Sequence, residues 1–317
     1  FHPLDCLPFT LLALKRINPD LHVVTDTGFW PGLIDLLHRK KTPILLFNGR
    51  ISEKSARRYL LAGSLFKDTF QKFHHFGMQN NNGEKVALTL GVDRERIEVM
   101  GDPKYDAQQP LTDEEKQQLR KTFKLETGTP VWIAGSTHAG EEEIILDAHQ
   151  QLTAEHPNLV LILAPRRIER VKEVVTLLKK RNISFTLRSS LKLAETVILL
   201  DTMGELAKVY SLGQVALIGK SLVKPGGGHS LIEPLSYGLP ILHGPFVENI
   251  GHVADKAHEL GLAITVQDSK NIKEKVHNFL ENKNLRQELA ENALSFTTEQ
   301  KGASEKMAEI ITKTLVI

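Results

Sequence analysis

A glycine-rich segment at 226–234 carries the strongest indication of chemistry in the sequence. It reads Gly-Gly-Gly-His-Ser-Leu-Ile-Glu-Pro and lies between an expected strand at 215–218 and an expected helix. Glycines let the backbone approach a ligand closely, and the N–H groups that begin a helix can bind a phosphate. Glu233 can accept two hydroxyl hydrogen bonds from a ribose. A flexible loop capped by Ser230 fits the same residues, so the motif alone leaves both interpretations open.

Three other expected strands also end in polar or cationic residues. Gly-Ser-Thr-His at 135–138 suits an anion or a sugar hydroxyl, although Ser and Thr are also common helix caps. Arg166 and Arg167 follow another strand and suit a phosphate or a carboxylate, unless they are solvated at a helix start. Asp-Thr-Met-Gly-Glu at 201–205 ends a fourth strand and opens a helix. Four such strand ends on one rim indicate a ligand site more strongly than any single motif.

Other chemistries find little support in the residues. The histidines are scattered and lack a metal-binding spacing such as His-Glu-x-x-His, so no metal site is expected; they include His74, His75, His138, His149, His229, His243 and His252. Walker, Gly-x-Ser-x-Gly and early Gly-x-Gly-x-x-Gly motifs are also missing, which disfavours P-loop ATPases, hydrolases and dehydrogenases. Cys6 is the single cysteine, which excludes an internal disulfide framework and suits a reducing compartment.

The elements that must position these residues alternate between strand and helix, which predicts parallel sheets. In the first third, strands are expected at 21–25, 43–47, 73–78 and 97–100, and helices at 31–39, 53–66 and 83–90. In the second series, strands are expected at 131–134, 159–164, 183–187, 197–200, 215–218, 240–242 and 263–266. Helices are expected there at 141–155, 168–180, 231–237, 271–280, 285–296 and 299–315.

A polar stretch at 108–128 separates the two series and contains a charged helix at 113–122 capped by Thr112. The expected domains are therefore 1–125 and 126–317, with the last helix a candidate for crossing back to the first domain. The first domain has about four strands where a doubly wound domain usually has about six. An N-terminal portion is therefore expected to be missing, and Phe1 in place of Met agrees with that expectation.

Length and composition set broad limits on function. The 317 residues have 40 Lys and Arg against 38 Asp and Glu, a net charge of +2, and 6% aromatics. This balance does not favour a nucleic-acid binder, and the length fits about two globular domains. No window approaches the roughly 18 consecutive apolar residues of a transmembrane helix.

With these segments assembled, the sequence resembles the 3-deoxy-D-manno-octulosonic acid (Kdo) transferases, a GT-B glycosyltransferase family (family 30) of lipopolysaccharide inner-core assembly. The resemblance covers almost the whole chain. Its motifs are Trp-Pro at 30–31, Asn-Gly-Arg-Ile-Ser-Glu at 48–53, Gly-Asp-Pro-Lys-Tyr-Asp at 101–106, Ala-Gly-Ser-Thr-His at 134–138 with Gly-Glu-Glu-Glu at 140–143, Pro-Arg at 165–166, Asp-Thr-Met-Gly-Glu-Leu at 201–206, and 227–234.

The resemblance implies an α/β fold of two Rossmann-like domains that face a cleft, with the N-terminal domain incomplete. It implies a metal-independent, inverting transfer of Kdo from CMP-Kdo to a lipid A precursor (lipid IVA), with CMP-Kdo as donor substrate and no cofactor. The partners implied are these two substrates and a membrane surface, without nucleic acid. By position, the CMP-binding residues are Pro165, Arg166, Met203, Gly204, Glu205, Ser230, Leu231, Ile232 and Glu233.

Two residues of the first domain are expected to be catalytic. Lys104 matches a family lysine assigned to transition-state stabilisation, which suits the charge on a departing CMP phosphate. Without the resemblance, Lys104 reads as a solvated loop lysine. Asp26 keeps one of two carboxylates that the family usually has before Trp-Pro, whereas Gly28 lacks the other.

Other residues of the site also differ from those usual in the family, and the resemblance implies a position for the general base and a cellular location. Asp102 and Ser230 stand where the family has asparagine, and Arg167 stands where it has histidine. The family's general base, a glutamate in a Gly-Glu motif, is expected upstream of Phe1. The expected location is the cytoplasmic face of the bacterial inner membrane, with an anchor outside these residues. Two alternatives remain open, which are a catalytically silent CMP-binding paralog and another GT-B sugar-nucleotide enzyme such as an epimerase.

Overall fold

The computed structural model describes residues 4–316, except for the side chain of Glu53. The chain forms two compact units, unit 1 (residues 1–107 and 300–317) and unit 2 (residues 108–299). The expected boundary after residue 125 therefore moves to residue 107. The reason is that Phe123 and Leu125 are buried within unit 2, where the Arg188 guanidinium lies 4.5 Å from the centre of the Phe123 ring.

Unit 1 contains a four-stranded parallel sheet, as the sequence predicts. Its strands are β1 (His22–Thr25), β2 (Ile44–Gly49), β3 (His75–Met78) and β4 (Ile97–Val99), in the order β1-β2-β3-β4. The β2 residues alternate between two cores. Ile44 and Leu46 face one core, and Leu45 and Phe47 face the other. The sheet is therefore covered on both faces.

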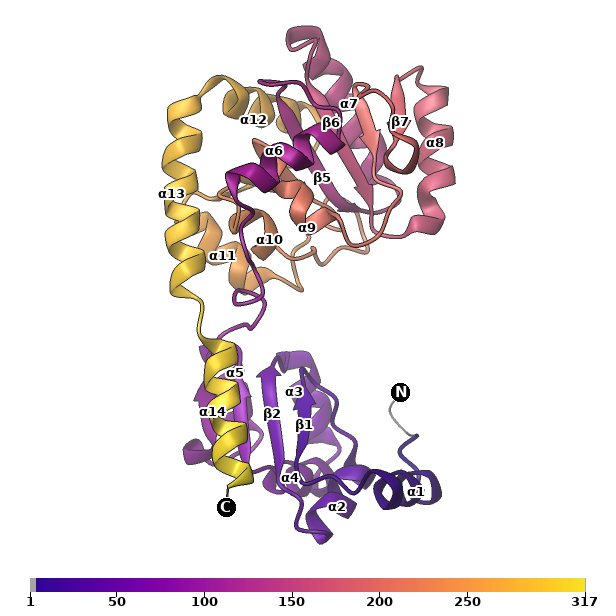
Figure 1. Ribbon diagram of the computed structural model, residues 1–317. Helices are drawn as coiled ribbons and strands as arrows, with labels where there is room; N and C mark the ends of the chain where they lie inside the picture. Colours follow the sequence, from indigo (N-terminus) through magenta and orange to yellow (C-terminus); the bar gives the residue numbers. More distant parts are fainter. Residues whose placement is uncertain (1–3, 317) are drawn as a thin grey trace. The chain divides into compact units, whose positions relative to one another are not determined.

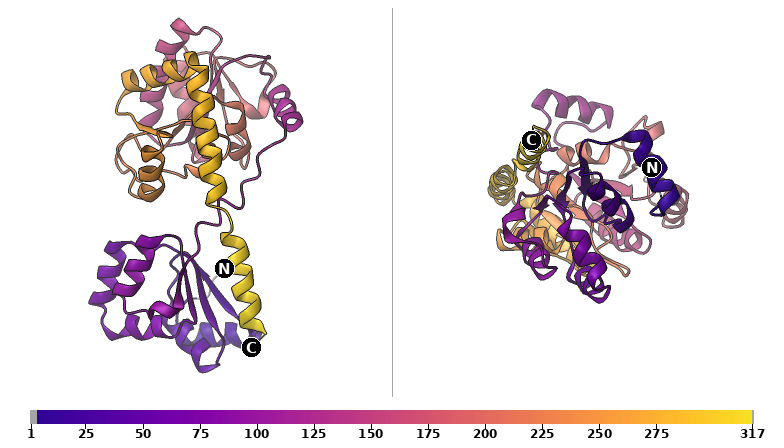
Figure 2. Two further views of the ribbon diagram at one scale, coloured as in Figure 1. Left: turned by 90° about the vertical axis from the view of Figure 1, so that its left-hand side faces the viewer. Right: turned by 90° about the horizontal axis from the view of Figure 1, so that it is seen from below.

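Helices from both ends of the chain cover this sheet. They are α1 (Leu7–Ile17), α2 (Pro31–Arg39), α3 (Glu53–Leu61), α4 (Ser64–Gln71), α5 (Asn81–Thr89), the 3-10 turn η1 (Arg94–Arg96) and α14 (Ala303–Leu315). Met307, Ile310 and Ile311 of α14 pack on the core of Leu45 and Phe47. Figures 1 and 2 show α14, in yellow, on the opposite face of the sheet from the purple helices of the same unit. The last helix thus belongs to the first unit.

Two local expectations for unit 1 are corrected by the structure. The single helix expected at 53–66 is two helices, α3 and α4, because Gly63 between them has φ +64°, which a continuing helix cannot accommodate. Helix α1 was not expected. Its side chains Leu7, Leu11 and Leu12 are exposed, so its apolar residues do not mark one buried face.

Unit 2 contains a seven-stranded parallel sheet in the order β11-β10-β9-β5-β6-β8-β7. Its strands are β5 (Val131–Thr137), β6 (Val160–Pro165), β7 (Phe185–Leu187), β8 (Val197–Leu199), β9 (Val215–Ile218), β10 (Ile241–His243) and β11 (Ala263–Thr265). Each corresponds to a strand expected from the sequence. From β5 the chain adds β6, β7 and β8 on one side of β5, and then β9, β10 and β11 on its other side. The strand order therefore reverses between β5 and β9. Ligands of such sheets bind at that reversal, beyond the carboxyl ends of the strands.

Unit 2 is completed by helices between and after these strands. They are α6 (Asp113–Thr122), α7 (Glu141–Glu155), η2 (Ile168–Arg170), α8 (Val171–Lys180), η3 (Arg188–Ser190), α9 (Leu206–Val209), η4 (Tyr210–Leu212), α10 (Ile232–Leu235), α11 (Gly251–Glu259), α12 (Ser269–Glu281) and α13 (Lys283–Glu299). Thr112 caps α6 in a reciprocal arrangement with Glu115, as expected. Helix α10 is shorter than the expected 231–237, and α11 fills a gap between strands for which the sequence predicted a helix without bounds.

Among the described residues, no helix is both long enough and apolar enough to cross a membrane.

Candidate functional site

The four polar strand ends singled out in the sequence are neighbours in the sheet of unit 2. Residues 135–138 and 165–167 include the last residues of β5 and β6, and residues 201–205 and 226–233 come after β8 and β9; the four strands stand side by side in the order β9-β5-β6-β8. Because all the pairings are parallel, the four segments leave the sheet at the same edge. We call this edge the unit 2 rim. It includes the reversal point between β5 and β9.

A pocket of about 270 Å³ opens at the carboxyl ends of β5, β6 and β8. Four of the residues expected to bind CMP line it: Pro165, Arg166, Met203 and Gly204. Pro165 is buried, Arg166 is exposed, and the Met203 side chain is 82% exposed. The pocket therefore has an apolar floor and a cationic edge, which suits a planar group joined to an anion.

Glu205 has internal partners. Its carboxylate accepts a hydrogen bond from Arg188 Nη2 at 2.8 Å and another from the Thr202 hydroxyl. These bonds hold together the loop that carries Met203 and Gly204. The structure therefore gives Glu205 a positioning contact, and its expected contact with CMP stays a prediction.

The segment 230–233 lies at the β9 end of the rim and outside the residues that line the pocket. The Ser230 hydroxyl accepts a hydrogen bond from the Ile232 N–H at 3.2 Å, but the N-cap position of α10 is Leu231, which makes no side-chain cap bond. Leu231 and Ile232 are buried in the core, so their side chains support the loop. Glu233 is half-buried and raises the pKa of the buried Tyr210 further above its usual value, in addition to the effect of burial. CMP binding by this segment also stays a prediction.

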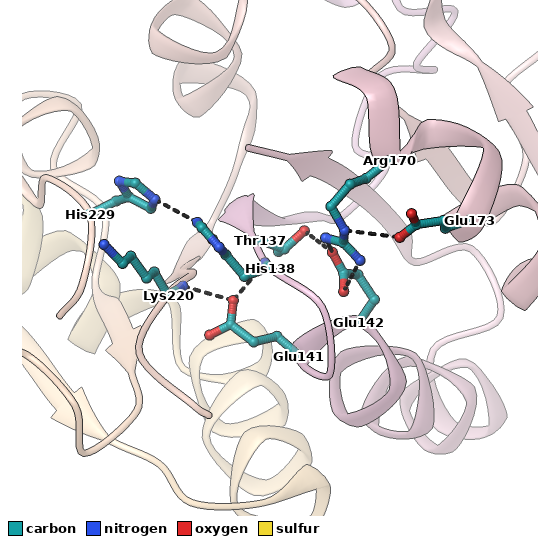
Figure 3. A network of polar contacts seen from close by, with 8 residues as sticks. All are labelled: Thr137, His138, Glu141, Glu142, Arg170, Glu173, Lys220 and His229. Carbon is teal, nitrogen blue, oxygen red and sulfur yellow. Dashed lines mark hydrogen bonds and ion pairs between the residues drawn. The ribbon is translucent and has the colours of Figure 1, made fainter. Parts of the chain in front are cut away.

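Glu141 is a buried carboxylate that holds two rim loops by their backbone (Figure 3). Its Oε2 accepts from the His138 N–H at 2.8 Å and the Lys220 N–H at 2.7 Å. Its Oε1 accepts from the N–H groups of Ser221 at 2.8 Å and Leu222 at 2.9 Å. The loop after β5 is thereby fixed to the loop after β9, across the reversal point.

Glu142, the next residue, is also buried and binds a different set of groups (Figure 3). Arg170 donates to it with both terminal nitrogens, at 2.7 and 3.2 Å, and the Thr137 hydroxyl donates at 2.9 Å. Arg170 also pairs with the exposed Glu173 at 3.1 Å. This bidentate pair connects the loop after β6 to the start of α7.

Two histidines meet above the reversal point. The Nε2 atoms of His138 and His229 lie 3.0 Å apart, and their rings are stacked with centroids 5.2 Å apart (Figure 3). Burial lowers the pKa of His229 to about 4, and His138, Arg166 and Lys220 act in the same direction. Burial also lowers the pKa of His138. Both rings are neutral at pH 7, so one Nε2 donates and the other accepts.

Two glycines of the rim are required by their surroundings. A Cβ atom at Gly135 would lie 2.0 Å from the Tyr210 hydroxyl oxygen. Gly227 has φ +124°, and a Cβ atom there would lie 2.2 Å from the Asn249 amide nitrogen. The close approach of the backbone inferred from the glycine-rich sequence is thus real. At these two positions it serves the packing of the protein itself.

The strand ends of unit 1 also carry polar side chains, and these bond to one another. Asn48 Nδ2 donates to Asp26 Oδ1 at 2.9 Å, and Gln79 Nε2 donates to Asn48 Oδ1 at 3.1 Å and to Asp102 Oδ2 at 2.6 Å. Arg50 pairs with Asp26 at 3.1 Å. The network spans the ends of all four strands, and we call it the unit 1 network.

Lys104, expected to be catalytic, lies beside this network. Its side chain is exposed, and its backbone N–H donates to Asp102 Oδ1 at 3.0 Å. Asp102 therefore fixes the turn that carries Lys104. The sequence did not single out Gln79, the residue that joins Asn48 to Asp102, since an isolated glutamine gives no motif.

Comparisons with known proteins agree with this architecture. Residues 1–107 match a family described as 3-deoxy-D-manno-octulosonic-acid transferase (kdotransferase), and residues 141–296 match glycosyl transferases group 1. The chain is 35% identical over 318 aligned positions to the 3-deoxy-D-manno-octulosonic acid transferase of Haemophilus influenzae, which covers 98% of this chain and 73% of that protein. The chain belongs to the Kdo transferase family. A transferase of the same name from Chlamydophila psittaci is 27% identical, covering 97% of this chain and 70% of that one.

Some solved structures resemble this member of the Kdo transferase family over part of its length, and others over nearly all of it. The C-terminal CMP-Kdo binding domain of WaaA from Acinetobacter baumannii has a TM-score of 0.54 and 31% identity, covering 57% of this chain and 94% of that chain. A putative UDP-N-acetylglucosamine 2-epimerase from Listeria monocytogenes has a TM-score of 0.63 and 14% identity, covering 95% of this chain and 76% of that chain. At that identity the epimerase shows the fold alone, which is the GT-B arrangement of two parallel-sheet α/β domains expected from the sequence.

Proposed function

We propose that this chain transfers Kdo from CMP-Kdo to a lipid A precursor with inversion, and that its unit 2 rim binds the CMP part of the donor. The observation that supports the donor site is the pocket at the ends of β5, β6 and β8, whose lining includes Arg166. A guanidinium matches a phosphate with two parallel hydrogen bonds. The similar domain of the Acinetobacter baumannii protein is described as CMP-Kdo binding.

The proposal assigns the phosphate charge to cations of the protein rather than to a bound metal. Arg166 stands at the pocket edge, and Lys104 stands in unit 1 on a turn fixed by Asp102. Stabilising charge that develops on the leaving phosphate favours the transition state over the bound substrate. Nucleotide binding is therefore expected to persist in EDTA.

The general base of the proposed reaction is a glutamate in the Gly-Glu motif that the family resemblance places outside residues 1–317. Asp26 and Asp102 are the carboxylates of the unit 1 network, and their oxygens accept from Arg50, Asn48, Gln79 and the Lys104 N–H. These bonds orient both carboxylates within the network. Asp26 is assigned to orienting Asn48 and Arg50.

The enzyme is proposed to act at a membrane surface, on the cytoplasmic side, because its acceptor is a lipid. Helix α1 supports this part of the proposal: it exposes the apolar side chains Leu7, Phe9, Leu11, Leu12 and Ile17. Lys15 and Arg16 lie in its last turn. Exposed apolar residues next to basic ones favour an anionic lipid surface. Co-sedimentation with anionic vesicles, reduced in a Leu7→Asp/Phe9→Asp variant, is the expected result.

Calorimetry with CMP tests the donor site. Arg166→Ala is expected to weaken binding by about 10- to 150-fold, the equivalent of one hydrogen bond to a charged group. Lys172→Ala is the matched variant, since Lys172 is an exposed cation of α8 that does not line the pocket. A smaller loss is expected there. Unchanged CMP affinity in Arg166→Ala, or an equal loss in both variants, would contradict the assignment.

A transfer assay tests the reaction itself. Residues 1–317 with CMP-Kdo and a lipid A precursor are expected to form product about 10²–10⁴ times more slowly than a longer chain that includes the Gly-Glu segment. Replacing that glutamate by alanine should abolish the difference. Full activity of residues 1–317 would instead identify a base among them, with Asp26 the first residue to replace.

A further inference from the structure

Three ligand-type side chains meet where α7 ends and α12 passes. Glu155 is the last residue of α7, His156 follows it, and His277 lies on α12. The His277 Nδ1 atom lies 3.1 Å from His156 Nε2 and 3.0 Å from Glu155 Oε2. One ligand atom from each of the three lies within 4.8 Å of the other two. Within the part of the chain that the structure describes, no other group of His, Cys, Asp and Glu meets this condition.

The Nδ1 atom of His277 lies within hydrogen-bond distance of two atoms, but a single proton on Nδ1 can form a good hydrogen bond to only one of them. A ring nitrogen carries at most one hydrogen, so Nδ1 can donate well to either His156 or Glu155. A cation among the three would accept a lone pair from each and satisfy all of them. In a tetrahedral zinc site with bonds of about 2.0–2.1 Å, neighbouring ligand atoms lie roughly 3.3 Å apart. The observed separations of 3.0 and 3.1 Å require only a small opening.

The surrounding charges orient the ligands. Glu281 Oε1 lies 3.8 Å from His156 Nδ1, on the other side of that ring from His277, so it favours a proton on Nδ1 and leaves Nε2 free to ligate. Lys273 Nζ lies 2.6 Å from Glu155 Oε1, and the other carboxylate oxygen, Oε2, is turned toward His277.

The position of the cluster separates it from the nucleotide pocket. Helix α7 begins with Glu141 at the unit 2 rim and ends at Glu155, so its 15 residues span roughly 22 Å. Residues 155 and 156 precede β6, whose opposite end forms the pocket. The cluster thus lies at the amino-terminal edge of the sheet, where a metal would join α7 to α12 without touching the donor.

We propose that Glu155, His156 and His277 form a zinc site that fastens α12 to the end of α7, with water completing the tetrahedron. Two imidazoles and one carboxylate are ordinary zinc ligands, and zinc has no geometric preference that this set would violate. Ligands from two helices make the ion stabilise unit 2, because the site exists only while the helices are packed. The site is independent of the proposed CMP site.

The test uses the whole chain, treated with EDTA, desalted and titrated with Zn²⁺ alone. One site is expected by calorimetry, and the midpoint of thermal unfolding should rise with Zn²⁺. His277→Ala should weaken binding at least 100-fold and remove the rise. Glu281→Gln should weaken it by about 10- to 100-fold, the usual effect of removing a carboxylate behind a ligating histidine. CMP affinity should stay unchanged in both variants.

His258→Ala is the matched control. His243 Nε2 and His258 Nε2 lie 2.8 Å apart, a histidine pair in the same unit that is not part of the cluster. Zinc binding should survive in this variant. No one-site binding by the unaltered chain, or binding that persists in His277→Ala, would overturn the proposal. Loss of binding in His258→Ala alone would overturn it as well. If His277→Ala does not fold, the Glu281→Gln result decides, because Glu281 is exposed.

Discussion

In unit 2 the two buried carboxylates that begin α7 bind the backbone, an arginine and a hydroxyl, whereas in unit 1 the polar side chains of the strand ends bind one another. Glu141 accepts four backbone N–H groups and thereby fixes two loops. In the unit 1 network, Gln79 and Asn48 connect Asp26 to Asp102. Because the loops of unit 2 are fixed by their backbone, side chains such as Arg166 remain available to a ligand. In the unit 1 network the polar side chains are instead hydrogen-bonded to one another.

The largest effect is expected at Glu141. Glu141→Ala leaves four N–H groups in a buried environment without their acceptor, so the free energy of unfolding should fall by about 3–5 kcal/mol. Glu141→Gln keeps one acceptor oxygen and should cost less. Urea unfolding followed by circular dichroism measures both.

Glu143→Ala provides the control on the same turn of α7, because Glu143 is exposed. It should change the free energy of unfolding by no more than about 0.5 kcal/mol. If Glu141→Ala were no worse than Glu143→Ala, the loops of unit 2 would not depend on the buried carboxylate.

A second effect concerns pH and the buried His149. Trp132 Nε1 donates to His149 Nδ1 at 3.1 Å, and His149 Nε2 lies 2.9 Å from the Thr196 carbonyl, so the ring is neutral with its proton on Nε2. Burial lowers the pKa of His149 to about 4 from a usual 6.5. The folded state then binds fewer protons than the unfolded state between these values.

Stability from this group is fully present above pH 6.5 and should be lost as the pH falls toward 4, by about 3 kcal/mol. An NMR titration of the histidine rings measures the pKa directly. A pKa of His149 near 6.5 would contradict the buried, neutral assignment.

The strands of both units could be predicted from the sequence because buried parallel strands form short, nearly continuous apolar runs. All four strand-end motifs of unit 2 were found for the same reason, as the residues next to those runs. The order β9-β5-β6-β8 that makes them neighbours is a property of the sheet, and strand patterns alone do not determine it. Helix α1 escaped prediction because its apolar side chains are exposed.

The supporting residues of the site were harder to predict, since their partners are distant in sequence. Glu141 looks like a favourable acidic residue at a helix start, yet it binds N–H groups about 80 positions later. Gln79, which follows β3, bonds Asn48 on β2 and Asp102 beyond the end of β4. His156 and His277 are 121 positions apart, so a search for short metal-binding spacings misses them.

In unit 1, a smaller loss is expected at Gln79. Gln79→Leu removes the donor at 2.6 Å from the buried Asp102, which should lower the free energy of unfolding by about 2–3 kcal/mol. Hydrogen exchange measured by mass spectrometry should become faster in peptides that contain β3 and β4. Gln71→Leu is the control, since Gln71 is exposed and bonds only the Gly91 carbonyl among the hydrogen bonds described for its side chain. Equal exchange in both variants would show that the unit 1 network does not stabilise its sheet.

The smallest effect is expected at Arg50, and it contrasts the two units through one residue type. Arg50 and its partner Asp26 are 43% and 45% exposed, and Asp26 keeps its bond from Asn48, so Arg50→Ala should cost less than about 1 kcal/mol. Arg170 is the matched arginine of unit 2, but its partner Glu142 is only 1% exposed. Arg170→Ala leaves that carboxylate with the Thr137 hydroxyl and should cost about 3 kcal/mol. High salt should reduce the Arg50 effect and leave most of the Arg170 effect, because solvent ions screen exposed pairs far more than buried ones. Similar losses and similar salt dependence in the two variants would remove the distinction between an exposed ion pair that orients a side chain and a buried ion pair that holds the loops of the rim.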